Sequence, residues 1–211
     1  MSASSLNKIL LIVQILRRKY GEINWWRGST DEVMIGAILT QQTRWENVEK
    51  ALLELREGSL CSLAAIHKAE RNDLERAIKC TGFYHIKAGR LKSLASHVIE
   101  GYGGIESMSG QTTDKLRQNL LEVPGIGEET ADSILCYGFF RPSFVIDTYT
   151  ERICRCGKIS AKRPVLKTLF EKVLPRDTRV YQEVHASIVE YAKEYCVKKR
   201  CMECAIPTLN G

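Results

Sequence analysis

The sequence predicts an all-α protein. Apolar residues recur at helical spacing along almost the whole chain, as in Leu6, Ile9, Val13 and Leu16, whereas the alternation typical of strands is scarce. Short turns rich in Gly, Pro, Asn or Asp separate these segments. In chain order, the expected helices cover residues 5–20, 31–40, 44–56, 60–67, 71–79, 85–101, 114–122, 128–138, 147–156, 163–173 and 178–195.

Length and composition limit the classes of protein that need to be considered. The 211 residues are 44% hydrophobic and 27% charged, enough for one or two domains with a real core. This length excludes a mini-protein, and with this composition disorder is not the default expectation. A net charge of +6 weakly favours an anionic partner such as nucleic acid. The apolar stretch at 9–13 is short and is followed by Arg17, Arg18 and Lys19, so we expect a cytoplasmic protein with no membrane partner and mostly reduced cysteines.

The most specific stretch runs from Leu120 to Leu135 and reads as helix, tight turn, helix. Gly125 and Gly127 let the backbone amides of the turn point outward, and the following helix adds its positive end, which predicts a phosphate-binding site. An ordinary pair of helices with glycine at the turn is the alternative. Further along, Asp147 follows three apolar residues and opens a helix, which a simple helix cap would also explain.

The run from Leu120 to Arg152 resembles the helix-hairpin-helix and Gly/Pro-Asp signature of the endonuclease III superfamily of DNA glycosylases. Residues 38–43 look like the glutamine motif of that family, and residues 82–91 look like its second helical turn. The resemblance covers roughly residues 20–204. It implies a two-lobed fold, with a six-helix barrel over 22–138 and a discontinuous helical domain made of 1–21 and 139–211. It also implies a monomer that binds double-stranded DNA containing a damaged base between the lobes, associated with the nucleoid if the source is a prokaryote.

The same resemblance implies roles for individual residues. Asp147 would be the catalytic carboxylate, which stabilises the cationic sugar and guides the attacking water. Gln41 would fill the gap left by the extruded nucleotide, although a plain polar surface residue is the alternative. The residues expected at the DNA are Gln41, Gln42, Lys87, Gly125, Gly127, Thr130 and Arg152. Arg90 and Lys92 are expected near it, and solvated surface charge is the alternative for these basic residues and for Arg44 and Arg141.

One departure from the family indicates which reaction to expect. Members that also cut the strand use a lysine two places after the second hairpin glycine, where this chain has Glu129, and no lysine occurs from Pro124 to Asp147. We therefore expect a monofunctional glycosylase that leaves an abasic site, with weak or absent lyase activity. Ala37 stands where the adenine-specific mismatch glycosylases need an acid, which argues against that specificity.

Two monofunctional branches resemble the chain. Residues 125–137 look like the 3-methyladenine branch, in which aromatic side chains stack on an alkylated purine. The expected base pocket is Trp25, Trp26, Trp45 and Glu129, with core packing and a first-turn acid as the plainer alternatives. An archaeal uracil-removing branch shares residues 24–26 and 131–135, so a uracil, thymine or oxidised-pyrimidine glycosylase stays open. A non-catalytic helix-hairpin-helix DNA-binding protein is the alternative from another class.

Three cysteines close to the end have the spacing C-x4-C-x2-C, namely Cys196, Cys201 and Cys204. Such spacing suits an iron-sulfur cluster or zinc. The resemblance implies four ligands of a 4Fe-4S cluster that the base chemistry does not need, and the fourth would fall near Asn210. A truncated tail, a ligand from elsewhere and a site without metal are all open. Cys154 and Cys156 could supply a ligand, but residues two apart on a helix face different sides, so packing is favoured, as it is for Cys61, Cys80 and Cys136.

Overall fold

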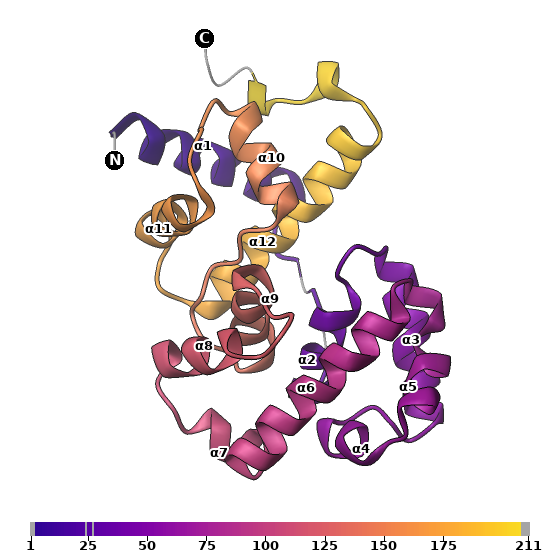
Figure 1. Ribbon diagram of the computed structural model, residues 1–211. Helices are drawn as coiled ribbons and strands as arrows, with labels where there is room; N and C mark the ends of the chain where they lie inside the picture. Colours follow the sequence, from indigo (N-terminus) through magenta and orange to yellow (C-terminus); the bar gives the residue numbers. More distant parts are fainter. Residues whose placement is uncertain (1–2, 24, 27, 208–211) are drawn as a thin grey trace. The chain divides into compact units, whose positions relative to one another are not determined.

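The protein is described by a computed structural model over residues 3–23, 25–26 and 28–207 (Figure 1). Within those residues every regular element is a helix and none is a strand, which confirms the all-α prediction. Asn24, which the archaeal resemblance used, and Asn210, where the fourth family cysteine would fall, lie outside the described residues. No helix among the described residues is long and apolar enough to cross a membrane.

The chain divides into two compact units. The central unit is Gly28–Arg141, and the terminal unit combines Met1–Arg27 with Pro142–Gly211. The boundaries expected from the sequence lie after residues 21 and 138, a few residues earlier than these two. The division into a six-helix barrel and a discontinuous helical domain stays a prediction.

Helix α2 (Thr30–Leu39) lies at the core of the central unit. Every residue from Val33 to Leu39 is buried, and the helix packs against its neighbours on several sides, as expected for a segment that is apolar all round. Its start is fixed by a capping box between Ser29 and Glu32. The other elements of the unit are α3 (Trp45–Glu57), α4 (Leu63–Lys68), α5 (Arg71–Ala77), η1 (Lys79–Thr81), α6 (Tyr84–Tyr102), α7 (Ile105–Ser109), α8 (Thr113–Leu121), α9 (Glu128–Ser133) and η2 (Ile134–Gly138).

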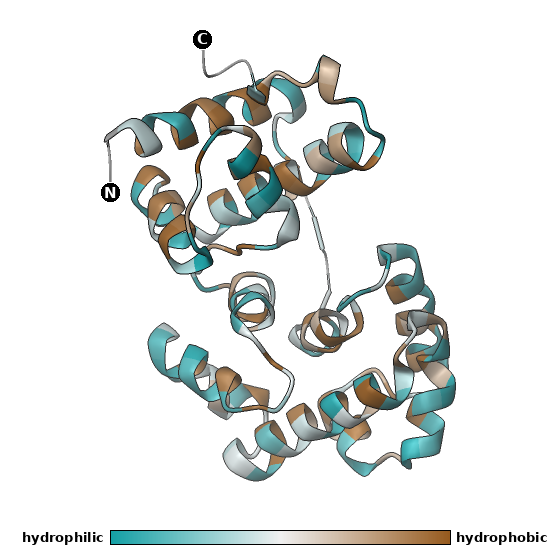
Figure 2. Cartoon of the chain, turned by 45° about the horizontal axis from the view of Figure 1, so that its top comes forward, coloured by the Kyte–Doolittle hydropathy of each residue, from teal (hydrophilic) through white to brown (hydrophobic). Residues whose placement is uncertain are grey.

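Helix α12 (Thr178–Ala192) lies at the core of the terminal unit. It packs against α1 (Ala3–Tyr20) and α10 (Thr148–Cys156), while α1 also packs against α11 (Arg163–Val173). Aromatic contacts fill the core, with Phe144 stacked on Phe170 at 4.3 Å and edge-on to Tyr181 at 5.6 Å. The unit ends in η3 (Lys193–Val197) and η4 (Cys201–Glu203). In Figure 2 the hydrophobic residues of these helices lie mainly on the faces turned toward other helices.

Some elements differ from the prediction. Helix α7 was not predicted because it is five residues long and lies between glycine turns, too short for a periodic pattern. The helix predicted over 128–138 is α-helical only to Ser133 and then widens into the π-helical turn η2. Gly138 ends that turn close against α2, where Thr30 Oγ1 donates to its carbonyl at 3.0 Å. Cys80, predicted to be buried, is exposed, whereas Cys136 is buried as predicted and Cys61 is half-buried.

Candidate active site

The turn of the helix-hairpin-helix joins α8 to α9 in the central unit. Gly125 has a φ of +90°, which favours glycine, and a Cβ there would come within 2.5 Å of Arg90 Nε. Gly127 is the N-cap of α9, and both glycines are exposed. The turn therefore presents bare backbone to solvent at the start of a helical segment, an arrangement that suits a phosphate oxygen.

An ion pair holds the two helices of the hairpin together. Arg117 of α8 donates from Nε to Asp132 Oδ1 at 2.8 Å and from Nη2 to Oδ2 at 3.1 Å. Asp132 is buried, and a bidentate pair of this kind fixes orientation as well as distance. Asp132 therefore has a structural task within the motif.

Gln41, the predicted gap-filling residue, is bound within the central unit. Its Nε2 donates to the carbonyl of Gly125 and to Thr130 Oγ1, both at 3.1 Å, and Arg90 Nη1 donates to its Oε1. Both ends of the amide are thus committed, and insertion into DNA would break all three hydrogen bonds. The structure does not favour Gln41 for that role. It assigns Gln41 and Thr130 to fixing the hairpin turn against the end of α2.

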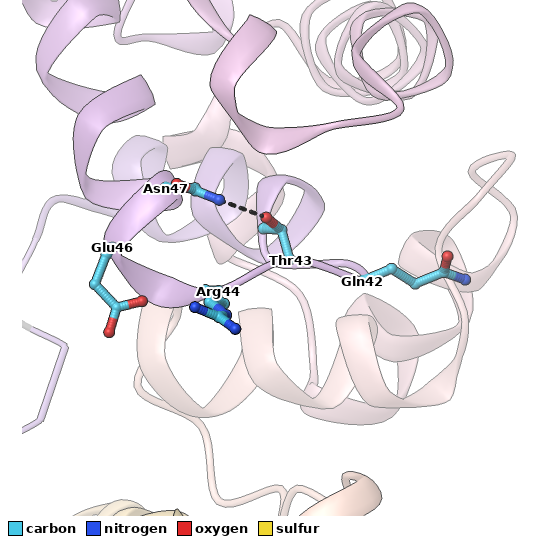
Figure 3. A pocket seen from close by; sticks show the side chains of 5 residues that line it. All are labelled: Gln42, Thr43, Arg44, Glu46 and Asn47. Carbon is cyan, nitrogen blue, oxygen red and sulfur yellow. Dashed lines mark hydrogen bonds between the residues drawn. The ribbon is translucent and has the colours of Figure 1, made fainter.

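Gln42, the next residue, is exposed and has a φ of +54°. It lines an open surface depression together with Thr43, Arg44, Glu46 and Asn47. Figure 3 shows the Gln42 side chain extending away from the other four, while Asn47 Nδ2 donates to Thr43 Oγ1 at 3.4 Å. Of the two glutamines, Gln42 is therefore the one whose side chain stands out from the surface.

Lys87 was expected at the DNA, and its burial contradicts that expectation. Its side chain is 2% exposed, and Nζ donates to the carbonyls of Leu39 and Thr81, each at 2.8 Å. Burial, reinforced by the charge of Arg90, lowers the pKa of Lys87 to about 8. Lys87 ties the end of α2 to the η1 turn. A sequence pattern cannot distinguish such a lysine from a surface one, because its partners are backbone carbonyls.

The other basic side chains expected near DNA fall into two groups, those that bind backbone carbonyls within the unit and those that are exposed. Lys92 donates to the carbonyl of His67 at 2.9 Å, and Arg141 donates to the carbonyl of Ser109 at 2.9 Å, so both help to hold the central unit together. Arg44 and Arg152 are exposed, on α3's N-cap and on α10 respectively. Contact of these two with DNA stays a prediction.

Asp147 is the N-cap of α10 in the terminal unit. Its Oδ1 accepts hydrogen bonds from the backbone N–H and from Oγ1 of Thr150, both at 2.7 Å, and its Oδ2 lies 3.7 Å from His185 Nε2. Burial by itself would raise the pKa of Asp147, but His185 and Thr150 outweigh it and hold the pKa below its usual value. The result is a largely buried carboxylate that stays ionised at neutral pH.

His185 and Trp25 complete the surroundings of this carboxylate. His185 is a buried residue of α12, and the Trp25 ring lies 5.5 Å from its ring, tilted by 59°. The Nζ atom of Lys193 also lies over the Trp25 ring, 6.0 Å from its centre, which is within reach of a cation–π interaction. His185 is not among the site residues expected from the sequence. The available signal was a polar residue inside the buried stretch of α12, a position that core packing explains equally well.

The predicted base-pocket residues fall in both units. Trp25 and Trp26 belong to the terminal unit, where Trp26 has a φ of +44°, and both are half-buried. Trp45 and Glu129 belong to the central unit, and Trp45 Nε1 donates to Glu49 Oε1 at 2.9 Å. A single pocket formed by all four residues stays a prediction.

The three tail cysteines lie in the terminal unit, with Cys196 in η3, Cys201 in η4 and Cys204 immediately after it. Cys204 is buried and Cys201 is exposed. Among the described residues, no three His, Cys, Asp or Glu side chains are gathered closely enough to hold a single metal ion. The iron-sulfur cluster expected from the resemblance therefore stays a prediction.

Comparison with known proteins decides the family. Residues 35–176 match the model of the HhH-GPD superfamily of base excision DNA repair proteins. The chain belongs to this superfamily. It is 43% identical over 213 residues to the protein MJ1434 of Methanocaldococcus jannaschii, whose given name proposes a DNA repair glycosylase, with 98% of this chain and 97% of that protein covered. Endonuclease III of Thermotoga maritima is 34% identical over 176 residues, covering 82% of this chain and 78% of that protein.

Solved structures agree with this membership of the HhH-GPD superfamily. The 3-methyladenine DNA glycosylase of H. pylori, bound to 1,N6-ethenoadenine, has a TM-score of 0.79 and 27% identity, covering 90% of this chain and 97% of that one. A trapped endonuclease III–DNA covalent intermediate has a TM-score of 0.82 over 97% of this chain and 94% of that one, and at 19% identity it speaks for the fold alone. The endonuclease III superfamily of DNA glycosylases, expected from the sequence, is thus confirmed.

Proposed function

We propose that this chain is a monofunctional DNA glycosylase that hydrolyses the N-glycosidic bond of a flipped, damaged base in double-stranded DNA and leaves an abasic site. The observation that carries the proposal is Asp147, a mostly buried carboxylate kept ionised at the start of α10. Membership in the HhH-GPD superfamily supplies the reaction class, and the residues of this chain supply the details.

Asp147 suits a reaction in which positive charge develops on the sugar. A fixed negative charge in a water-poor setting stabilises such an oxocarbenium-like state strongly, because it is oriented before the charge appears. The two hydrogen bonds from Thr150 fix Oδ1. The carboxylate is thereby held in one orientation, from which it can stabilise the sugar and orient a water molecule.

His185 is a positioning residue in this proposal. Its imidazole lies 3.7 Å from Asp147 Oδ2 and rests against Trp25 on another side. The imidazole in that place limits the movement of the carboxylate. The tryptophan, in turn, is one of the aromatic residues that we assign to the flipped base.

The absence of a suitable lysine supports hydrolysis without strand cleavage. A lyase reaction needs an amine that attacks the sugar, and the hairpin offers Glu129 where the lyases of the family carry lysine. Lys87, the lysine of the preceding motif, is buried and donates to two carbonyls, so it does not replace the missing amine. Hydrolysis by Asp147 and water needs no metal, and the cysteine tail supplies no step of it.

We further propose that Gln42, rather than Gln41, occupies the space left by the flipped nucleotide. Gln42 is exposed and extends from the surface, whereas Gln41 is hydrogen-bonded at both ends of its amide. The exposed turn at Gly125 and Gly127, in the same unit, would hold the DNA backbone.

An alkylated purine is the substrate that we favour. The likeness to the H. pylori 3-methyladenine glycosylase supports it, and so does Trp25, since an electron-poor methylated ring stacks well on an indole. A pyrimidine lesion is the second candidate, because a thymine-DNA glycosylase of Aeropyrum pernix is 25% identical over 202 residues, 90% of this chain and 86% of that protein.

The test is a set of labelled duplexes that carry 1,N6-ethenoadenine, hypoxanthine, uracil, an oxidised pyrimidine or a thymine mismatch. Each is incubated with the protein and scored for strand cleavage with and without hot alkali, and for covalent trapping by borohydride. We expect the duplex with the alkylated purine to be cleaved at the lesion only after alkali, because base release leaves an abasic site. We expect borohydride to trap no covalent adduct.

Each contrary outcome removes a different part of the proposal. Cleavage without alkali together with efficient trapping contradicts the monofunctional reaction. Preferential release of uracil or thymine contradicts the purine preference and favours the second candidate. DNA binding without release of any base contradicts the enzyme and leaves a helix-hairpin-helix binding protein.

A further inference from the structure

The segment that leads to Asp147 has no regular structure of its own. Residues 142–147 lie between η2 and α10 and belong to neither helix, yet the side chains from Ser143 to Ile146 are buried. Backbone groups of buried residues outside helices need hydrogen-bond partners from elsewhere, because an unpaired N–H or C=O away from water is costly. The direction in which Asp147 points therefore depends on the groups that bind the backbone of this segment.

Two charged side chains of α11 bind the backbone of Phe144, one at each of its polar groups. Glu171 Oε1 accepts a hydrogen bond from the Phe144 N–H at 3.0 Å, and Lys167 Nζ donates to the Phe144 carbonyl at 2.9 Å. The two side chains also bind each other, with Lys167 Nζ 3.2 Å from Glu171 Oε1. The contacts form a closed ring around one residue, and we call Lys167 and Glu171 the α11 clip.

The α11 clip adds direction to a segment that core packing already retains. The ring of Phe144 stacks on Phe170 at 4.3 Å, but apolar contacts fix no orientation of the peptide planes. Hydrogen bonds do so because they are directional, and bonds to a charged partner are stronger than those between neutral groups. Lys167 Nζ also donates to Oγ of the buried Ser143 at 2.7 Å. Two successive residues of the segment are thus held by one ammonium group.

The same face of α11 holds the chain on the other side of Asp147. Arg163 Nη2 donates to Glu151 Oε2 at 2.8 Å, and the Glu151 N–H donates to the Asp147 carbonyl at 3.0 Å. Arg163, Lys167 and Glu171 follow one another at intervals of four residues, so they lie on one face of the helix. Helix α11 therefore contacts the chain both before Asp147 and one helical turn after it.

We propose that Lys167 and Glu171 are positioning residues for Asp147. They fix the backbone three residues before the carboxylate, so that Asp147 Oδ1 keeps its hydrogen bonds from Thr150 and its direction toward the sugar. This role rests on the glycosylase function proposed above, since a carboxylate oriented in advance matters when charge develops on a substrate. Misplacement of a reacting group by about 1 Å can cost a factor of about 100 in rate.

The first test follows backbone amides and needs no substrate. Hydrogen exchange over residues 142–151 is measured for full-length wild type, Glu171→Met and Glu171→Gln. The Thr150 N–H, which donates to Asp147 Oδ1, reports the orientation of the carboxylate. We expect the Phe144 and Thr150 amides to exchange about tenfold faster in Glu171→Met. Glu171→Gln keeps an acceptor for the Phe144 N–H and should stay close to wild type. Unchanged exchange at Thr150 in Glu171→Met would overturn the proposal.

The second test measures single-turnover release of the preferred base at a temperature at which circular dichroism shows each variant folded. Glu171→Met should lower the rate at saturating protein by about ten- to a hundredfold and leave the half-saturating protein concentration unchanged. Glu171→Gln should recover most of the rate. The matched control Tyr20→Phe removes a 2.8 Å hydrogen bond to Glu194 elsewhere in the terminal unit and should release the base at the wild-type rate.

Three outcomes separate this proposal from the proposed function. Wild-type rates in Glu171→Met, or weaker lesion binding in place of a slower rate, would contradict the positioning role and leave the glycosylase intact. If the wild type released no base from any duplex, the glycosylase function would fail, and the amide exchange would still show whether the α11 clip orients Asp147. Lys167→Met removes only the donor to the Phe144 carbonyl and should show the same two changes if Glu171→Met does not fold.

Discussion

At the scale of single residues, Lys87 has a task that its chemistry alone does not reveal. A lysine in a helix close to a predicted DNA site is ordinarily a phosphate contact, but this one is enclosed and donates to the carbonyls of Leu39 and Thr81. Replacing it by methionine would keep the volume and leave two buried acceptors unsatisfied, at a cost of about 1 to 3 kcal/mol each.

Lys87→Met should therefore destabilise the protein, and the size of the effect should depend on pH. The pKa of Lys87 is about 8 in the folded protein and 10.5 in the unfolded chain, so the unfolded chain binds the extra proton between these values. The contribution of Lys87 to the free energy of unfolding must then rise from pH 8 to about 10.5.

Urea denaturation of wild type and Lys87→Met across that range measures the difference directly. A difference that stays constant between pH 8 and 10.5 would show that the amine is not buried as described. Because Lys87 does not reach the surface, the salt dependence of DNA binding should be the same in the variant as in the wild type.

At the scale of elements, the segment between α2 and α3 divides two tasks between adjacent glutamines. Gln41 joins the end of α2 to the hairpin turn, and Gln42 extends outward. The motif was predictable from the sequence, but the division was not, because both residues have the same side chain and only the backbone turn at Gln42, with a φ of +54°, separates their directions.

Gln42→Ala should slow base release from paired duplexes by about tenfold or more, because the flipped state loses the group that fills its gap, and each 1.4 kcal/mol corresponds to one factor of ten. The same lesion in single-stranded DNA has no gap to fill, so its rate should hardly change. Gln41→Ala is the matched comparison and should instead lower the melting temperature. If Gln41→Ala gave the duplex-specific loss and Gln42→Ala did not, the two assignments would have to be exchanged.

At the scale of the whole molecule, the fold could be read from the sequence because helical periodicity is a local property that recurs along most of the chain. The hairpin and Asp147 could be placed for a similar reason, since their function depends on a short segment of backbone. Positions that depend on distant partners could not be placed. His185, for example, approaches Asp147 from another helix, α12.

The base pocket, too, depends on residues that are distant in the sequence, so its composition could not be worked out from local patterns. Trp25 could be related to Asp147 because both lie in the terminal unit, where His185 connects them. Trp45 and Glu129 belong to the central unit, and their part in the pocket rests on the resemblance to the glycosylases. The central claim of the account therefore depends on Asp147.

The most direct test of that claim compares Asp147→Asn with Asp177→Asn in single-turnover release of the preferred base. Both aspartates cap helices, Asp147 at α10 and Asp177 at α12, so the two variants make the same change to a helix start. The account predicts that Asp147→Asn slows release by about 10²- to 10³-fold while lesion binding persists, and that Asp177→Asn releases the base at nearly the wild-type rate. Undiminished release by Asp147→Asn would contradict the account and leave Asp147 as a helix cap.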